Sequence, residues 1–217
     1  DDAGKVITVT ASYIDGATSA ESVTSAGTSA ISTPPLNDSN FNTAINLWFS
    51  DEANATATYG HIKDWNVTGV TNMSHAFYNR TNFNENITGW DVSNVSIMAG
   101  IFRNAQNFNQ PIGDWNVSSV SSTTNMFSYA SAFNQPINDW DTSKVTTMNY
   151  MFDGASSFNQ SIVDWKVSGV SNMTNMFGGS TALSNAHKGL IHSSFSSNSS
   201  WPYDWSAHVP APAILTN

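Results

Sequence analysis

Five tryptophans recur in this chain at an unbroken spacing of 25 residues. Other apolar residues keep the same phase: an Ile precedes each Trp by three residues, and a Val and a Phe follow it by five and twelve. A fixed period of about 20–50 residues is typical of repeat proteins, in which each unit forms one coil and neighbouring coils cover its apolar edges. The tryptophans are Trp65, Trp90, Trp115, Trp140 and Trp165.

Equivalent residues of stacked coils lie above one another, and we call each such set a column. The apolar columns are predicted to form the core, which includes Phe102, Phe127, Phe152 and Phe177. For the Trp column a second interpretation stays open, namely an exposed aromatic ladder on which a sugar or peptide stacks. Ile and Trp are three residues apart, so a strictly alternating strand cannot direct both inward. Either a bulge separates them or one column faces out.

The local pattern within each repeat predicts three pieces of structure. Ile-x-x-Trp-x-Val is rich in β-forming residues and predicts a short strand. The Ser, Thr and Asn residues that follow favour a turn, because their side chains bond nearby backbone groups. Val-x-x-Met-x-x-x-Phe has spacings of three and four, which fit a helical turn or a short 3₁₀ segment. Together these pieces predict an α+β solenoid of leucine-rich-repeat-like coils with helical caps, preceded by a short β hairpin.

The sequence divides into five segments. Residues 1–33 alternate like two strands and predict a β hairpin or the remnant of an Ig-like domain. Residues 34–60 are the predicted N-terminal cap, 61–180 the five repeats and 181–205 the C-terminal cap. Residues 206–217 contain two prolines and are predicted to be a linker. Caps are required because the end coils otherwise expose apolar edges.

Each cap predicts one amphipathic helix. In the N-terminal cap, Asp38 or Ser39 is the expected N-cap residue of a helix. Its apolar face is Phe41, Ala44, Ile45 and Trp48. The corresponding stripe of the C-terminal cap is Leu183, Ala186, Leu190 and Ile191.

Composition excludes several classes of partner. Charged residues make up only 11% of the chain, the net charge is −9 and the pI is about 4.6. This acidity argues against nucleic acid and anionic membranes, since phosphate binding needs Lys and Arg. The chain has no Cys, which excludes disulfides, thiol nucleophiles and Cys-ligated metals. No stretch is apolar enough to span a membrane, so we expect no direct membrane insertion.

The pattern Phe-Asn-x-x-Ile-x-x-Trp-x-Val-Ser-x-Val-x-x-Met-x-x-Met-Phe resembles the repeats of BspA-type, leucine-rich-repeat-like bacterial surface proteins. Residues 133–152 and 158–177 carry it most fully, and it covers roughly residues 41–205. Residues 1–33 are similar to the last strands of Ig-like repeats in large secreted bacterial adhesins. The resemblance implies an extracellular protein, at the bacterial cell surface or secreted, that is used in adhesion and has no enzymatic activity. It transfers no site residues.

No catalytic constellation is recognisable in the sequence. There is no Gly-x-Ser-x-Gly elbow, no Gly-rich phosphate loop and no His-Glu-x-x-His pattern. His187 and His192 are five residues apart, a poor spacing for one helix face. We therefore expect no enzyme and no cofactor or metal, with one exception. Asp1 and Asp2 are candidates for a calcium site at the N-terminal domain junction.

Two columns beside the tryptophans are the candidate ligand-binding face. The column after Trp varies from repeat to repeat, and such variable positions on a constant scaffold could determine which ligand is bound. The alternative is that these residues are only solvated. The column before Trp is mostly Asp, and stacked carboxylates repel one another. A cation or basic ligand could relieve that, or the carboxylates are solvated or bond backbone groups in a turn. The candidates are Asn66, Asp91, Asn116, Asp141, Lys166, Asp64, Asp114, Asp139 and Asp164.

Many asparagines of the repeats are followed two residues later by Ser or Thr. We expect these asparagines to form side-chain ladders between coils or to cap turns. The overall prediction is a monomeric, non-catalytic ligand-binding or adhesion module that recognises a protein, peptide or glycan through the exposed face of its repeats. A structural spacer or an ice- or surface-binding repeat domain is the alternative.

Overall fold

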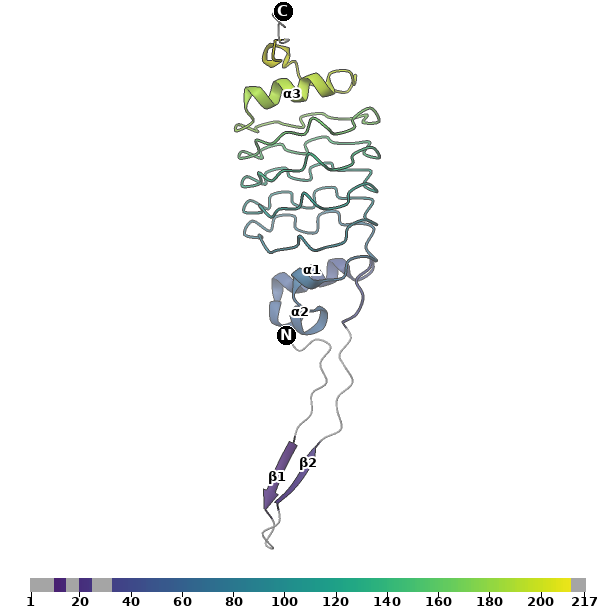
Figure 1. Cartoon of the computed structure of the whole chain (residues 1–217), viewed down its shortest axis with the longest axis vertical. Helices are drawn as coiled ribbons and strands as arrows, with labels where there is room; N and C mark the ends of the chain where they lie inside the picture. Colours follow the sequence, from purple (N-terminus) through teal and green to yellow (C-terminus); the bar gives the residue numbers. More distant parts are fainter. Residues whose placement is uncertain (1–9, 15–19, 25–32, 212–217) are drawn as a thin grey trace, which may run out of the picture.

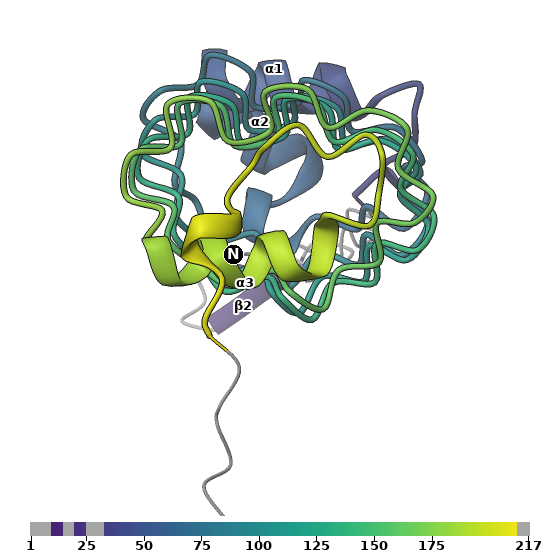
Figure 2. The same ribbon diagram turned by 90° about the horizontal axis from the view of Figure 1, so that it is seen from above.

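The structure is a computed structural model that describes residues 10–14, 20–24 and 33–211. The 25-residue repeats form coils that are stacked in one direction. The helices labelled α1 and α2 lie at one end of the stack, and α3 lies at the other (Figure 1). Viewed along the stack, the coils are nearly superposed closed loops (Figure 2). The elements are β1 (Thr10–Ile14), β2 (Ala20–Thr24), α1 (Phe41–Ser50), α2 (Glu52–Tyr59), the 3₁₀ helix η1 (Ile62–Asp64), α3 (Asn185–Phe195) and the 3₁₀ helix η2 (Ser206–His208).

The two short strands lie within residues 1–33, the segment predicted to be a β hairpin or the remnant of an Ig-like domain. β1 and β2 pair antiparallel, with Thr10 opposite Thr24 and Ile14 opposite Ala20. The rest of this segment, up to residue 32, lies outside the described residues. Asp1 and Asp2, the candidates for a calcium site, also lie outside them.

The predicted α+β solenoid with leucine-rich-repeat-like coils is wrong. From residue 65 to residue 184 the chain contains neither an α-helix nor a strand, and the β-bridges between consecutive coils are isolated and parallel. These bridges form one line down the stack: Asn72↔Ile97, Ile97↔Ser122, Ser122↔Thr147 and Thr147↔Asn172. The coils are built from turns, and the α-helices are confined to the two ends.

The segment expected to be helical is a run of turns whose N–H groups alternate in direction. In the first coil the N–H groups of Met73, His75 and Phe77 donate to carbonyls of the next coil at 2.9–3.0 Å. The intervening N–H groups of Ala76 and Tyr78 fold back onto carbonyls three residues earlier. Later coils repeat this arrangement. The spacings of three and four therefore bury Val, Met and Phe without a helix, because half of the backbone bonds run between coils.

This alternation requires left-handed backbone at two positions in each coil. Ten residues after each Trp the chain has a positive φ, and again four residues later. Asn and Gly fill most of these positions because they adopt this conformation at low cost. The residues are His75, Asn79, Gly100, Asn104, Asn125, Tyr129, Tyr150, Gly154, Asn175 and Gly179.

A turn also explains how Ile and Trp both point inward although they are three residues apart. In every coil the backbone N–H of Trp donates to the carbonyl of the Ile three residues earlier at 3.1–3.3 Å. This bond closes a turn, so both side chains point to the same side, as they could not in an extended strand. The five tryptophans are only 3–4% exposed, so the Trp column is core and not an exposed ladder. Four of the indoles donate from Nε1 to the Ile carbonyl of the preceding coil at 2.8–3.3 Å. Each Trp thus fills the core and joins two coils.

Two columns of Phe form the centre of the core. Phe77 and its equivalents follow one another at ring-centroid distances of 5.4–5.7 Å. Within a coil, the ring of Phe102 stacks on that of Phe108 at 3.8 Å, and the first, third and fourth coils repeat this contact. Near-parallel rings at these distances match the offset stacking that aromatic pairs prefer.

The Asn of each Phe-Asn pair forms a ladder along the stack. The Oδ1 atom of Asn109 accepts the N–H of Asn134 at 2.9 Å, and Asn134 does the same for Asn159. The Gln that follows Asn134 strengthens the ladder, since Gln135 Nε2 donates to both the backbone oxygen and the Oδ1 atom of Asn109. The ladder ends at the C-terminal cap, where Ser184 N–H donates to Asn159.

The N-terminal cap supplies the contacts that a preceding coil would make. α1 buries the expected face of Phe41, Ala44, Ile45 and Trp48. Its N-cap residue is Asn40 with no side-chain capping bond, so the predicted capping by Asp38 or Ser39 is wrong. Instead the Asp38 carboxylate accepts the N–H groups of Thr71 and Asn72 and the Thr71 hydroxyl. These N–H groups begin the first run of turns, where no earlier coil is present.

The C-terminal cap closes the stack in the same way. Ser184 caps α3, which buries Gly189, Ile191 and Phe195. Ala186 and Leu190 of the predicted stripe are exposed. The Tyr203 hydroxyl accepts the Phe177 N–H at 2.8 Å, in place of a carbonyl from a sixth coil. η2 packs so closely on α3 that a Cβ at Gly189 would overlap the His208 carbonyl.

Candidate ligand-binding face

The predicted column after Trp is exposed, but its side chains also support the backbone. Each Asn or Asp in it accepts the N–H of the residue two positions later, which is an Asx turn. Hydrogen bonds from the Ser93 hydroxyl and N–H hold the pKa of Asp91 below its ordinary value. Ser143 lowers the pKa of Asp141 in the same way, aided by the Lys166 ammonium 3.4 Å away. The column is Asn66, Asp91, Asn116, Asp141 and Lys166.

The predicted Asp column before Trp is exposed as well. Asp64 lies 4.0 Å from Lys63, and Asp164 exchanges hydrogen bonds with Asn138 of the preceding coil. Asp114 and Asp139 are exposed. Among the described residues, no group of three or more His, Asp or Glu side chains is arranged to hold a metal ion.

The two histidines considered for a shared site have separate partners. His187 Nδ1 lies 2.8 Å from Asn159 Oδ1, at the end of the Asn ladder. His192 Nδ1 accepts the Trp201 indole N–H at 3.1 Å. Both therefore fasten the C-terminal cap.

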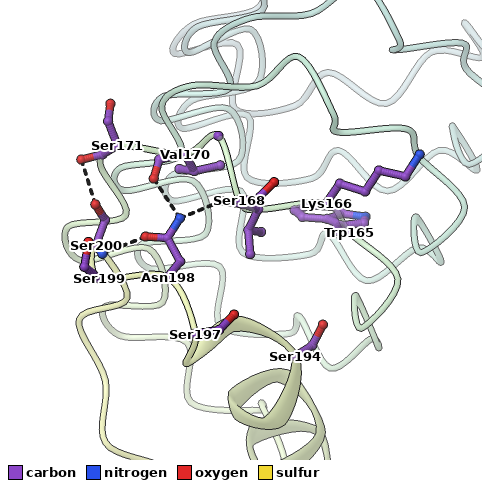
Figure 3. Close-up of a pocket in the computed structure, with 12 residues that line it drawn as sticks. Trp165, Lys166, Ser168, Val170, Ser171, Ser194, Ser197, Asn198, Ser199 and Ser200 are labelled. Atoms are coloured by element: carbon purple, nitrogen blue, oxygen red, sulfur yellow. Dashed lines mark hydrogen bonds between the residues drawn. The ribbon is translucent and has the colours of Figure 1, made fainter.

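A hollow of about 660 Å³ lies along the seam between the fifth coil and the C-terminal cap. Figure 3 shows Asn198 reaching across this seam, where its Nδ2 donates to the carbonyls of Val167 and Val170. The Ser200 hydroxyl donates to the Ser171 carbonyl at 3.0 Å. The polar groups that cross the seam thus satisfy carbonyls at the end of the stack, and the hollow is best explained by the way the cap docks.

A different surface carries the exposed aromatic side chains of the coils. We define the turn face as the solvent-facing residues of 74–79, 99–104, 124–129, 149–154 and 174–179, the left-handed segments described above. Tyr78, Tyr129 and Tyr150 lie there and are 41%, 52% and 37% exposed. They are the large apolar side chains exposed within the described coils; the others, Leu190 and Val209, belong to the C-terminal end.

The turn face is hollowed between the second and fourth coils. A cleft of about 340 Å³ brings together two aromatic rings, a cation, a carboxylate and two amides from three successive coils. One of its lining residues, Ser128, is buried. We call this the tyrosine cleft, and its lining is Arg103, Asn125, Ser128, Tyr129, Asn149, Tyr150 and Asp153.

The charged groups of the tyrosine cleft lie at its two ends. Arg103 and Asp153 occupy the same column two coils apart, about 10 Å at roughly 4.8 Å per coil. The Arg103 guanidinium lies over the Tyr78 ring at 5.4 Å. Asp153 accepts the Asn175 amide at 2.9 Å. Burial raises the pKa of Asp153, against this bond and the field of Arg103.

Glycines of the next coil make room for the rings of the turn face. A Cβ at Gly154 would lie 2.6 Å from the Tyr129 ring, and one at Gly100 would lie 2.9 Å from the His75 ring. Each glycine occupies a left-handed position, so it serves both the backbone and the neighbouring side chain.

The turn face was not among the predicted site residues, although the sequence holds a signal for it. The positions that adopt positive φ read His, Gly, Asn, Tyr, Asn in one column and Asn, Asn, Tyr, Gly, Gly in the other. Recurring Asn and Gly at fixed phase indicate left-handed turns, whereas the spacings of three and four in the same segment favour a helical turn. Tyr129 and Tyr150 occupy two of these positions.

A family model described as "Mycoplasma protein of unknown function, DUF285" matches residues 43–144 and 124–201. The two overlapping matches extend from α1 through the coils to the C-terminal cap, and the chain belongs to this family. No curated protein and no solved structure matches the chain. None of the helices in the described part of the chain has the length and apolar character that crossing a bilayer requires.

Proposed function

We propose that the chain is a non-catalytic recognition module that binds its ligand on the turn face. The observation that carries this is the gathering of exposed tyrosines, Tyr78, Tyr129 and Tyr150, on one surface of a stack whose other aromatic columns are buried. Exposed Tyr combines a large apolar ring with a hydroxyl and loses little conformational entropy on binding, which is why it is common at interfaces.

The stacked architecture supports this proposal. Bonds between coils fix the turn segments, so the side chains of the turn face stand on a rigid frame. Residues at equivalent positions differ from coil to coil while the core columns stay nearly constant. A rigid frame with variable exposed residues is the arrangement that other repeat proteins use for binding.

The resemblance to BspA-type surface repeats supports the setting that we propose, an adhesion module of a bacterial cell-surface or secreted protein. The ligand is then a glycan, peptide or protein of a target cell or surface. The acidic, weakly charged composition is consistent with a partner other than nucleic acid.

A spacer or an ice-binding surface is the alternative function. A regular column of Ser and Thr does run along the stack, as ice binding would need: Thr71, Ser96, Ser121, Thr146 and Ser171. From the second coil onward, however, each hydroxyl donates to the carbonyl of the equivalent residue in the preceding coil at 3.0–3.2 Å. These hydroxyl protons are thus already used within the protein, which favours recognition at the turn face.

The test is a screen on glycan and peptide arrays with two matched triple variants. The turn-face variant is Tyr78→Ser, Tyr129→Asn and Tyr150→Asn, which places residues that other coils already carry in these columns. The control is Asp91→Asn, Asp141→Asn and Lys166→Asn, which does the same for the column after Trp. The proposal expects array signals that the control retains and the turn-face variant loses. Silence of the folded protein on both arrays, or signals that the turn-face variant keeps, would reject it.

A further inference from the structure

We infer that the tyrosine cleft is a subsite for a neutral saccharide, with one sugar ring on Tyr129 and its hydroxyls bonded by Asn125, Asn149 and Asp153. The inference rests on the proposed function and adds the chemical class of the ligand. It follows from the shape, the polar groups and the charge of the cleft.

Tyr129 is half exposed, and its left-handed backbone and the absence of a Cβ at Gly154 let the ring lie against the next coil. A flat aromatic surface held in this way suits the apolar C–H face of a pyranose, which buries apolar area without a deep pocket. Tyr150, from the following coil, forms a second aromatic wall of the cleft.

The polar groups around these rings are planar amides and a carboxylate. Asn149 Oδ1 accepts the Thr124 hydroxyl at 2.8 Å, which orients the amide and leaves Nδ2 as a donor. Asp153 Oδ1 accepts from Asn175, which orients the carboxylate and leaves its second oxygen as an acceptor. Paired donors and acceptors on fixed side chains match neighbouring hydroxyls of a sugar, each of which can donate and accept.

The backbone argues against a peptide in this cleft. Extended peptides gain affinity by pairing with unused N–H and C=O groups at a sheet edge. On the turn face the N–H groups alternate between bonds to the next coil and bonds within the coil. Recognition here therefore depends on side chains, and the volume of about 340 Å³ fits a small ligand at the low end of the roughly 300–1,000 Å³ typical of such sites.

The charges favour a neutral ligand. Arg103 and Asp153 face the cleft from opposite ends. An anionic sugar in the cleft is attracted by Arg103 but repelled by Asp153, and a cationic ligand is attracted by Asp153 but repelled by Arg103. A neutral sugar bonds both groups without this conflict.

The test is isothermal titration of the whole chain with four neutral tetrasaccharides, namely cellotetraose, maltotetraose, mannotetraose and chitotetraose. Tetragalacturonic acid and the strongest array peptide are the comparison ligands. We expect saturable binding of at least one neutral tetrasaccharide, weakened at least fivefold by Tyr129→Asn and by Asp153→Ser. Both variants place a residue found in that column of another coil, and Asp141→Asn is the control that should bind normally.

The outcomes separate this inference from the proposed function. If the four neutral sugars are silent at millimolar concentration, or if the acidic sugar binds more tightly, the saccharide assignment is overturned. If only a peptide binds and the turn-face variant abolishes it, the proposed function stands and the saccharide assignment falls. If the bound ligand is insensitive to every turn-face substitution, both are wrong. Circular dichroism of each variant before titration establishes that it is folded.

Discussion

The phenol ring of Tyr129 lies against Gly154 of the next coil, and a Cβ on that glycine would come within 2.6 Å of the ring. Both residues have left-handed backbone, with φ of 57° and 70°. His75 and Gly100 repeat the relationship near the first coil. The turn face is therefore shaped by pairs of residues from successive coils: one supplies the ring and the other supplies the space for it.

The first prediction concerns this pair. Gly154→Ala and Gly179→Ala both place a Cβ at positive φ, and we expect each to cost roughly 1–2 kcal/mol of unfolding free energy. Only Gly154→Ala also displaces a ring, because the nearest atom to a Cβ at Gly179 is 3.5 Å away. Urea unfolding and ligand titration should show similar destabilisation but weaker binding for Gly154→Ala alone. Equal binding by the two variants would mean that the position of the Tyr129 ring does not matter.

The second prediction concerns the Trp column. Trp115→Phe keeps an aromatic ring in the core but removes the N–H that bonds the Ile87 carbonyl at 3.3 Å. The Ile87 carbonyl keeps the Trp90 N–H as a donor, so the loss is that of one hydrogen bond, about 0.5–1.5 kcal/mol, and the smaller ring adds a cavity. We expect a lower urea midpoint with little change in binding. An unchanged midpoint would show that the indole bond contributes nothing to the stack.

The third prediction concerns the Asn ladder. Asn134→Ala removes the oxygen that accepts the Asn159 N–H and the Gln160 amide. We expect a loss of about 1–3 kcal/mol, since the partly buried Asn159 N–H loses its acceptor, while the Gln160 amide keeps only the Asn134 carbonyl. Asn116→Ala is the matched control, because the Asn116 side chain is exposed and accepts only the nearby Ser118 N–H. The account requires Asn134→Ala to be clearly the more harmful of the two in thermal unfolding.

The fourth prediction concerns pH. The hydroxyl and N–H of Thr71 hold the pKa of Asp38 below its ordinary value of 3.8. A lowered folded-state pKa means that the stabilising contribution is complete above about pH 4–5 and is lost as the pH falls through the folded-state value. We expect Asp38→Asn to lower the melting temperature at pH 7 and to differ less from the parent near pH 3. Asp64→Asn, beside the exposed Lys63, should change neither value; a gap for Asp38→Asn that widens on acidification would contradict the linkage.

The repeat pattern predicted what is buried better than how the backbone runs. Trp65 and Phe127 are core residues, because a large apolar side chain at fixed phase has to be covered by its neighbours. The predictions of a strand and of a helical turn in each repeat were wrong, because spacings of three and four arise equally from i→i+3 turns. Hydrogen bonds between coils decided between these structures, and those bonds join residues 24–26 positions apart.

The candidate site was harder to predict, for a physical reason. Asp91 and Asp141 vary and are exposed, as specificity residues would be, yet Asx turns account for both. Tyr129 and Tyr150 are exposed at left-handed positions of the turns, which the sequence indicates only once the Asn and Gly of the same columns are recognised as left-handed. The cleft also includes Asp153 of the fourth coil, which lies near Tyr129 of the third coil only because the coils are stacked.

The central claim is that recognition takes place on the turn face. Its most direct measurement is amide hydrogen exchange, with and without the strongest ligand from the arrays, read coil by coil. The account predicts new protection at residues 124–129 and 149–154 and little change around Asn66, Asp91, Asn116, Asp141 and Lys166. Protection centred on that second set, with the turn face unchanged, would contradict it.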